Sequence, residues 1–375
     1  MSIVRAVQSR HGLALAMGLG LVCATGQAPL GWAWIALAAF AAALALLAIP
    51  EHWQIAAWRG WALGTGYFGG CLFWIVEPFL VDVARHGWMA PFALGLMAGG
   101  LALFWAAAFG LAARLGRTRN LRILWLVLLL SGAEILRSFL FTGFPWALIG
   151  HIWIGAPQMQ LAALVGAHGL TLFTLAVASL PALFGVQRVL LGVIVGAALA
   201  SLPAAYALYR VPSGPVALAE PAQVIRLIQP NAPQHEKWHP DLVPLFYQRQ
   251  LDLTAAAPIA GAMRPDVIVW PETAIPWLLE HAEPAFAEMA AAGQGAQIIV
   301  GLQRRSDEGL WFNTLAVVEP NGALAATYDK HHLVPFGEYM PLMRVFARLG
   351  AFGLAANDTG GYSAGPGPVL LDLSL

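Results

Sequence analysis

Cysteine and lysine are both scarce in this chain of 375 residues. Cys23 and Cys71 are the two cysteines, and Lys237 and Lys330 are the two lysines. Both cysteines lie in apolar stretches, which favours a small buried side chain at each position over a disulfide, a metal ligand or a nucleophile. The formal net charge is +0, and no basic region stands out. Nucleic-acid binding is therefore excluded from the expected functions.

Charged residues are few in the first part of the chain. Residues 1–210 hold 15 of the Asp, Glu, Lys and Arg side chains, whereas the shorter remainder, 211–375, holds 25. A charge at the centre of a bilayer costs about 2.5–3.5 kcal/mol on insertion scales. The asymmetry predicts a transmembrane helical domain over 1–210 and a more polar domain over 211–375.

Seven apolar stretches are candidates for membrane spans, since a helix needs about 20 apolar residues to cross a bilayer. They lie near residues 12–28, 30–49, 55–80, 88–113, 121–140, 158–184 and 187–209. The first stretch follows Arg5 and Arg10 and resembles a signal peptide, but six further stretches favour an uncleaved helix. We predict a polytopic α-helical membrane domain with about seven spans.

The arginines between the stretches predict an orientation. They gather before the first span and at alternate links, most densely in the group from Arg114 to Arg122. The positive-inside rule therefore places the N-terminus in the cytoplasm. With seven crossings, residues 211–375 fall on the opposite side, which is the periplasm in a bacterium.

Two polar features interrupt the apolar part. Glu134 and Arg137 are three residues apart, so they share one helix face and can neutralise each other. Residues 142–146 contain Gly143, Pro145 and Trp146 and predict a break between helices at the membrane surface. That segment is interpreted either as a lipid entry site or as an ordinary interfacial anchor.

The polar part alternates between strand and helix patterns. We predict strands at 223–229, 266–270, 297–301, 314–318, 323–328 and 369–373, and helices at 241–257 and 283–292. Asn321 and Gly322 predict a tight hairpin turn with positive φ angles, and residues 349–367 predict a loop. The pattern is typical of an α/β domain.

Three side chains that can take part in catalysis follow these predicted strands. Glu272 comes at a strand end beside Pro271, where burial would raise its pKa toward that of a general base. Lys330 ends the hairpin and can stabilise a developing oxyanion, and Glu338 is a second carboxylate eight residues later. Each also has a structural interpretation: a capped buried Glu, a solvated Lys and a surface Glu.

The segments that carry these residues, 267–273 and 328–341, resemble the nitrilase superfamily, whose members use a Glu, Lys and Cys triad. Two further features narrow the resemblance: several apolar spans precede this domain, and residues 229–231 and Trp238 open it. Together they make the chain similar to the apolipoprotein N-acyltransferase family. The resemblance implies an αββα sandwich for 211–375. It also implies a bacterial inner-membrane protein with a periplasmic catalytic domain.

In that family, a phospholipid acyl donor forms a thioester with the enzyme, and the acyl group passes to the N-terminal lipid-modified cysteine of a diacylglyceryl apolipoprotein. The resemblance assigns Glu272 as general base, Lys330 as oxyanion stabiliser and Glu338 as supporting carboxylate. It places Trp238, Phe144 and Trp146 toward the substrates. No cofactor and no metal are expected.

The chain departs from the family at the nucleophile. The family's cysteine is expected on a strand just beyond Leu375, so we expect an incomplete sandwich and no acyl transfer from these residues alone. One alternative is a membrane-anchored nitrilase-type amidase that uses water as the acceptor. Another is a non-catalytic membrane fragment or transporter, although no internal repeat supports a transporter.

Overall fold

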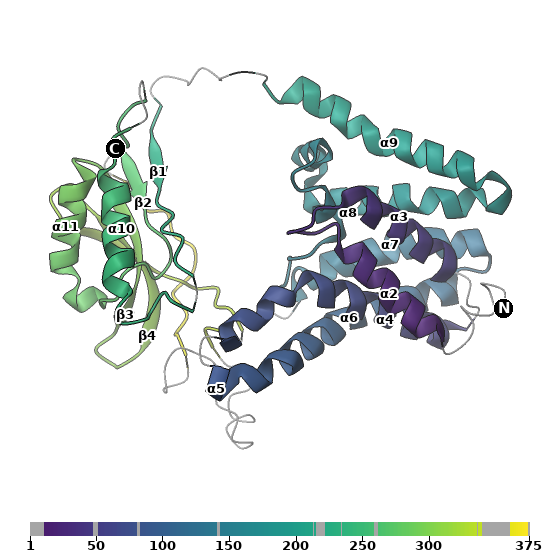
Figure 1. Cartoon of the computed structure of the whole chain (residues 1–375), viewed down its shortest axis with the longest axis horizontal. Helices are drawn as coiled ribbons and strands as arrows, with labels where there is room; N and C mark the ends of the chain where they lie inside the picture. Colours follow the sequence, from purple (N-terminus) through teal and green to yellow (C-terminus); the bar gives the residue numbers. More distant parts are fainter. Residues whose placement is uncertain are drawn as a thin grey trace. The chain divides into compact units, whose positions relative to one another are not determined.

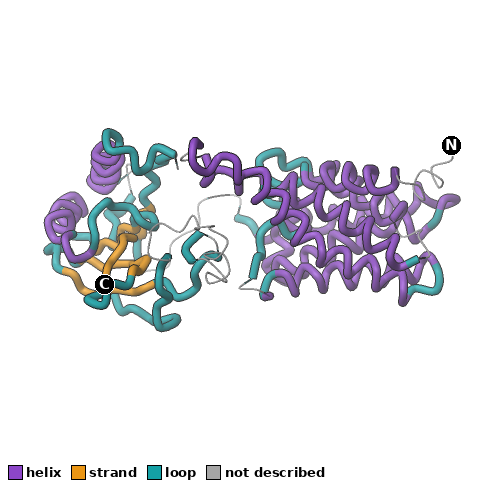
Figure 2. Tube along the Cα trace, turned by 90° about the horizontal axis from the view of Figure 1, so that it is seen from below, coloured by secondary structure: helices purple, strands orange, loops and turns teal. Residues whose placement is uncertain are grey.

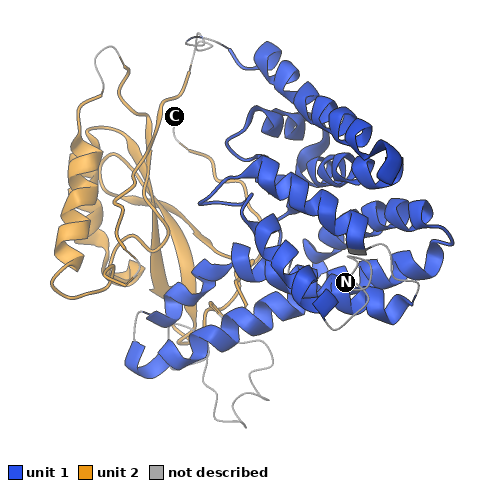
Figure 3. Cartoon of the chain, turned by 45° about the vertical axis from the view of Figure 1, so that its right-hand side comes forward, with its two compact units in different colours: residues 1–216 blue, residues 217–375 orange. Residues whose placement is uncertain are grey.

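The computed structural model describes residues 11–47, 52–80, 83–140, 143–212, 214, 222–233, 235–258, 262–335, 337–339 and 361–373. The chain forms two compact units, unit 1 (Met1–Val216) and unit 2 (Ala217–Leu375), coloured separately in Figure 3. The described helices of unit 1 are joined by loops and short 3₁₀ turns, and the described strands all lie in unit 2 (Figure 2).

The described part of unit 1 contains seven long helices, and each overlaps one of the predicted apolar stretches. They are α2 (His11–Ala24), α3 (Ala33–Leu47), α4 (Trp53–Cys71), α6 (Ala90–Leu115), α7 (Arg119–Arg137), α8 (Ala162–Phe184) and α9 (Val189–Arg210). The shorter elements are α5 (Val83–His86) and the 3₁₀ turns η1 (Phe73–Leu80), η2 (Gly87–Met89), η4 (Ile149–Trp153), η5 (Pro157–Leu161) and η6 (Val186–Arg188).

Aromatic side chains fill the centre of unit 1, where α4 packs between α2 and α6. The rings of Tyr67 and Trp105 stack with centroids 5.0 Å apart, and Phe40 and Phe68 contact the same pair. All four side chains are buried. Such pairs stabilise beyond their buried area because ring edges and faces carry opposite partial charges.

Three helical segments in the described part of the chain are long and apolar enough to cross a membrane. They are Val83–Leu115, Pro157–Phe184 and Val186–Arg210. The described parts of α2 and α3 have 14 and 15 residues, fewer than the span of a bilayer requires, and α7 carries four charged residues. The count of seven spans therefore stays a prediction.

Unit 2 contains a five-stranded sheet in the order β1-β2-β3-β4-β5 (Figure 1). The strands are β1 (Ile225–Leu227), β2 (Val267–Val269), β3 (Gln297–Arg305), β4 (Trp311–Val318) and β5 (Leu324–Asp329). The first three pair in parallel, and β4 and β5 are added antiparallel. The predicted α/β pattern and the first five predicted strands are confirmed.

The helices α10 (Val243–Ala255) and α11 (Glu283–Gly293) lie on one side of this sheet, with the short turn η7 (Leu279–His281) preceding α11 (Figure 1). Ile298, Val300 and Leu302 of β3 alternate onto that face and pack in one buried cluster with Phe286 and Met289 of α11. The described residues thus give one helical layer and one sheet layer of the predicted αββα sandwich.

Two local predictions for unit 2 were wrong. Residues 369–373 form no strand, and Leu370 is 99% exposed, because no strand of the described chain pairs with this segment. At the hairpin turn, Gly322 has a positive φ of 85° but Asn321 does not. The pairing register of β4 and β5 shifts between Val317 and Val318. A hairpin with such an irregularity needs one residue with positive φ, whereas a two-residue type I′ turn needs two.

Candidate active site

Glu272, Lys330 and Glu338 lie in one hydrogen-bonded cluster in unit 2. Lys330 Nζ donates to Glu272 Oε1 over 3.1 Å and to Glu338 Oε1 over 2.9 Å. The ammonium group therefore bridges the two carboxylates. Three side chains that are up to 66 residues apart in the sequence come together because the strands that precede them belong to one sheet.

Asn313 is a fourth member of the cluster, and the sequence analysis missed it. Its Nδ2 donates to Glu272 Oε1 and, over 2.9 Å, to Glu338 Oε1. Its backbone carbonyl accepts from the Lys330 amide over 2.8 Å. The available signal was an amide residue inside strand β4, where Asn is disfavoured unless its side chain has a local partner.

Glu338 is the most enclosed of the three charged side chains, with 13% of its side chain exposed. Its second oxygen, Oε2, accepts from the Val334 amide over 2.7 Å. The backbone carbonyl of Glu338 accepts from the Tyr362 amide over 2.7 Å. Glu338 therefore joins the segment around Val334 to the segment around Tyr362 and orients Lys330.

A close backbone approach fixes the turn that carries Glu272. Gly301 of β3 donates its amide to Pro271 O over 3.2 Å and accepts from the Ala274 amide over 2.7 Å. A Cβ atom at Gly301 would lie 2.6 Å from Glu272 Cα. Thr273 has a positive φ of 48°, a strained value for a residue branched at Cβ.

The direction of the Glu272 pKa shift corrects the sequence-based expectation. Burial raises this pKa, but hydrogen bonds from Lys330 and Asn313 and the charges of Lys330 and Lys237 outweigh it, so the pKa lies below its ordinary value. The Glu272 side chain is 61% exposed, which weakens the effect of burial. Glu272 is thus an ionised carboxylate at neutral pH.

Lys330 is shifted in the opposite direction. Burial lowers its pKa, but the hydrogen bonds and negative charges of Glu338 and Glu272 outweigh burial and hold the pKa above its ordinary value. The ammonium group is therefore charged at neutral pH. An ionised carboxylate can accept a proton, and a fixed ammonium group beside it can stabilise an oxyanion.

Lys237 and Trp238 lie at the edge of the same cluster. Lys237 Nζ donates to the Glu272 backbone carbonyl over 3.2 Å and lies 5.1 Å from the Trp238 ring centroid. Burial lowers the Lys237 pKa, partly offset by the charge of Glu272. Both lysines of the chain therefore contact Glu272, which the sequence did not reveal. The Trp238 ring is exposed.

Phe144 and Trp146 lie in unit 1, in the loop between α7 and η4. Their ring centroids are 5.6 Å apart, and Trp146 is 53% exposed. Thr142, at the start of the predicted interfacial segment, lies outside the described residues. Cys23 of α2 and Cys71 of α4 are buried free thiols, as the sequence predicted.

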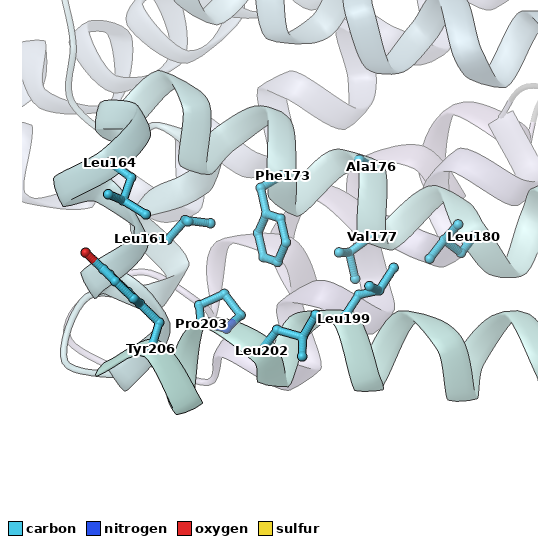
Figure 4. Close-up of a pocket in the computed structure, with 10 residues that line it drawn as sticks. All are labelled: Leu161, Leu164, Phe173, Ala176, Val177, Leu180, Leu199, Leu202, Pro203 and Tyr206. Carbon is cyan, nitrogen blue, oxygen red and sulfur yellow. The ribbon is translucent and has the colours of Figure 1, made fainter. Parts of the chain in front are cut away.

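A separate apolar cavity of about 440 Å³ lies between α8 and α9 in unit 1 (Figure 4). Phe173 and Leu180 line it from α8, and Leu199 and Tyr206 line it from α9. None of the predicted site residues takes part. In the described part of the chain, no group of three or more His, Cys, Asp or Glu side chains is placed to hold a metal ion.

The comparisons with known proteins define first the class of unit 2. Residues 224–365 match the carbon-nitrogen hydrolase family model, which covers the sheet and the cluster of Glu272, Lys330 and Glu338. Unit 2 is a nitrilase-like domain with a mixed sheet. Residues 19–180 match a second model, the apolipoprotein N-acyltransferase N-terminal domain.

Relatives that match along both units identify the family. An apolipoprotein N-acyltransferase of Caulobacter vibrioides is 38% identical over 97% of this chain and 70% of the relative. Those of Sinorhizobium fredii and Brucella suis are 37% and 36% identical over 84% and 82% of this chain, which covers 61% and 59% of their lengths. The chain belongs to the apolipoprotein N-acyltransferase family, and the sequence resemblance is confirmed.

Among solved structures, a crystal structure of an N-terminal amidase is similar over 29% of this chain and 28% of that chain, with 23% sequence identity and a TM-score of 0.23. A TM-score this low bears on neither fold nor function.

Family membership and the three long apolar helices identify a membrane protein.

Proposed function

We propose that this chain takes part in phospholipid-dependent N-acylation of apolipoproteins at their N-terminal lipid-modified cysteine. The observation that carries the proposal is the Lys330 ammonium bridging Glu272 and Glu338, in a chain whose relatives are named for this reaction. The donor is a membrane phospholipid and the acceptor is a diacylglyceryl apolipoprotein. The setting is the bacterial inner membrane, with the N-terminus in the cytoplasm and unit 2 in the periplasm.

In the proposed first step, the Glu272 carboxylate accepts the proton of a thiol, and the thiolate attacks the ester carbonyl carbon of the phospholipid. Lys330 stabilises the resulting oxyanion. The tetrahedral intermediate then expels the lysophospholipid alkoxide, which takes the proton back from Glu272. A thioester remains on the enzyme, and Glu272 is again ionised.

In the second step, the α-amino group of the apolipoprotein attacks the thioester, and Glu272 accepts a proton from the attacking amine. The thiolate leaves, an amide bond forms, and the thiolate is reprotonated from Glu272. Splitting the transfer into two displacements lowers each barrier. Glu338 and Asn313 hold the Lys330 and Glu272 side chains in place throughout. The lipid-bearing substrates are proposed to contact Trp238, Phe144 and Trp146.

Neither cysteine of this chain is proposed as the thiol. Cys23 and Cys71 are both buried within helices of unit 1, and unit 2 contains no cysteine. The thiol is proposed to be the cysteine of the Glu, Lys and Cys triad. Glu272 is proposed to supply the base of the reaction and Lys330 its oxyanion partner.

A fusion experiment tests this assignment. The segment of the Caulobacter relative that follows its region of similarity is appended to Leu375, and N-acylation of a lipoprotein peptide is measured by mass spectrometry in membranes. We expect activity in the fusion and its loss in Glu272→Gln and Lys330→Met. The exposed Glu308 provides a matched control, and Glu308→Gln should retain full activity.

Full activity of the Glu272→Gln fusion would refute the role of Glu272 as base. An inactive fusion whose unit 2 shows native hydrogen-exchange protection would refute the proposal that these residues complete the site. Release of free fatty acid without acylated peptide would instead favour a hydrolytic enzyme that uses water as the acceptor.

A further inference from the structure

The backbone carbonyl groups of the loop between α7 and η4 point toward a buried guanidinium. Arg137 Nη1, at the end of α7, donates to Phe144 O and, over 2.8 Å, to Trp146 O. Its Nη2 lies 3.5 Å from Ala147 O. In return, the Phe144 amide donates to Arg137 O over 2.9 Å. One side chain therefore fixes the path of four residues.

The end of the loop is held by a second pair of buried polar groups. Gln27 Nε2 donates to Leu148 O over 3.0 Å and to the Tyr67 hydroxyl over 2.7 Å. That hydroxyl donates to Ala147 O over 3.2 Å. Ala147 has a positive φ of 54°, and a strained residue of this kind persists where its surroundings over-determine it.

Arg137 is itself fixed from several directions. Glu134 accepts from it through both carboxylate oxygens, over 3.2 Å and 2.8 Å, and both side chains are fully buried. Trp105 Nε1 donates to Glu134 over 2.9 Å. The guanidinium carbon lies 5.0 Å from the Phe68 ring centroid. The planar guanidinium has five N–H donors in a fixed fork, which can serve a carboxylate and several carbonyls at once, whereas an ammonium group has three.

Because the carbonyls turn inward, aromatic side chains of the loop form a surface. Trp146 packs against Phe144 on one side and against Trp74 of η1 on the other, with centroids 5.6 Å and 4.9 Å apart. Trp74 is 39% exposed and Trp146 is 53% exposed. We name Trp74, Phe144 and Trp146 the aromatic ledge.

We propose that Arg137, oriented by Glu134, is a positioning residue that holds the aromatic ledge in place to bind an acyl chain of a membrane phospholipid. The inference rests on the proposed function, in which Phe144 and Trp146 contact lipid, and it adds Trp74, Glu134 and Arg137 to that site. Burying an ion pair in an apolar helical unit is costly. If Arg137 served only to neutralise Glu134, it would not need its contacts to the carbonyls of Phe144, Trp146 and Ala147. These contacts indicate that it also positions the loop.

Lipid photolabelling tests the proposal on the full chain without requiring acyl transfer. The protein is placed in bilayers of phosphatidylethanolamine and phosphatidylglycerol that contain phosphatidylethanolamine with a diazirine on its acyl chain. Label on the ledge peptides is measured by mass spectrometry relative to label on α9, whose Leu208 and Tyr209 are exposed. We expect the ledge to be labelled more strongly than α9.

Arg137→Met should lower that ratio by about tenfold or more, because a factor of ten corresponds to about 1.4 kcal/mol and hydrogen bonds from a charged group contribute at least as much. The matched control is Arg119→Met. Arg119 donates to Ala182 O over 2.7 Å and to Ala45 O over 3.3 Å, elsewhere in unit 1. This variant should leave the ratio unchanged.

Trp74→Ala and Trp146→Ala keep the buried ion pair and test the ledge directly, so the proposal stays falsifiable if Arg137→Met fails to fold. Each should lower the label on the remaining ledge residues by severalfold. A ratio that none of these variants changes would overturn the proposal. Normal labelling of the ledge, together with no N-acylation by the fusion described above, would count against the proposed function and leave the ledge in place.

Discussion

Replacing Glu338 by alanine should destabilise unit 2 more than any change at an exposed carboxylate. The side chain accepts three hydrogen bonds, from Lys330 Nζ, Asn313 Nδ2 and the Val334 amide. In Glu338→Ala all three donors lose this partner, and Lys330 keeps only its contact to Glu272.

The expected magnitude follows from burial and charge. Hydrogen bonds to a charged group contribute about 1.5–3 kcal/mol each, and removing one partner of a buried pair costs about 3–5 kcal/mol. Glu338 is 13% exposed, and water can replace part of what is lost. We therefore expect a loss of about 3 kcal/mol in the free energy of unfolding of unit 2.

Glu338→Gln is a stringent companion variant. Both carboxylate oxygens accept from N–H donors, so either orientation of the glutamine amide places an NH₂ group against a donor. This variant should therefore also destabilise unit 2, by about 2 kcal/mol. Glu308→Ala is the control, since Glu308 is exposed, and its effect should stay within about 0.5 kcal/mol.

The assay is amide hydrogen exchange of the full chain in detergent, read by mass spectrometry on peptides from β3 and β4. A loss of 3 kcal/mol would accelerate global exchange of these strands by about a hundredfold, while peptides from unit 1 should not change. If Glu338→Ala matched Glu308→Ala, the three hydrogen bonds would not stabilise the fold and the reasoning would be refuted.

Three further predictions concern the same cluster and the thiol. The lowered pKa of Glu272 stabilises unit 2 above the ordinary carboxyl pKa, and this stability is lost as pH falls through the folded pKa. The raised pKa of Lys330 also stabilises unit 2, and this stability is lost as pH rises through its folded pKa. The unfolding free energy of unit 2 should therefore show a plateau between these two limits, and a pH profile that Lys330→Met leaves unchanged at both limits would contradict this. Gly301→Ala should cost about 1–3 kcal/mol because its Cβ meets backbone atoms, whereas Gly100→Ala, with no atom within 4 Å of its Cβ, should not destabilise the protein. Radiolabelled phospholipid should leave no hydroxylamine-sensitive label on Cys23 or Cys71, because both thiols are buried in helices of unit 1, and label on either would refute the assignment of the thiol.

The sequence was sufficient for features that depend on local pattern. Apolar runs predicted the seven long helices of unit 1, and the alternation of buried strands with helices predicted the sheet of unit 2. Glu272 and Lys330 stood out in the sequence because each lies close behind a strand. Glu272 follows β2 after two further residues, and Lys330 directly follows β5. These features follow from periodicity and residue type, which neighbouring residues determine without reference to the rest of the chain.

Other features were decided by contacts between distant residues. Asn313 lies just before the predicted strand 314–318, and only the longer β4 of the folded chain places its amide between two carboxylates. The direction of the Glu272 pKa shift depended on Lys330, which lies 58 positions away. By contrast, the pairing of Glu134 with Arg137 was predictable from the sequence, because the two residues are three positions apart on one helix.

The sequence thus determined which secondary structures form and which side chains can perform chemistry. Only the tertiary structure decided which side chains meet, as with Lys330 and Glu272 in unit 2 and Trp74 and Trp146 in the ledge. The physical reason is that helix and strand preferences act over a few residues. The charge state of a site and the shape of a binding surface depend instead on groups that folding brings within hydrogen-bonding or van der Waals distance.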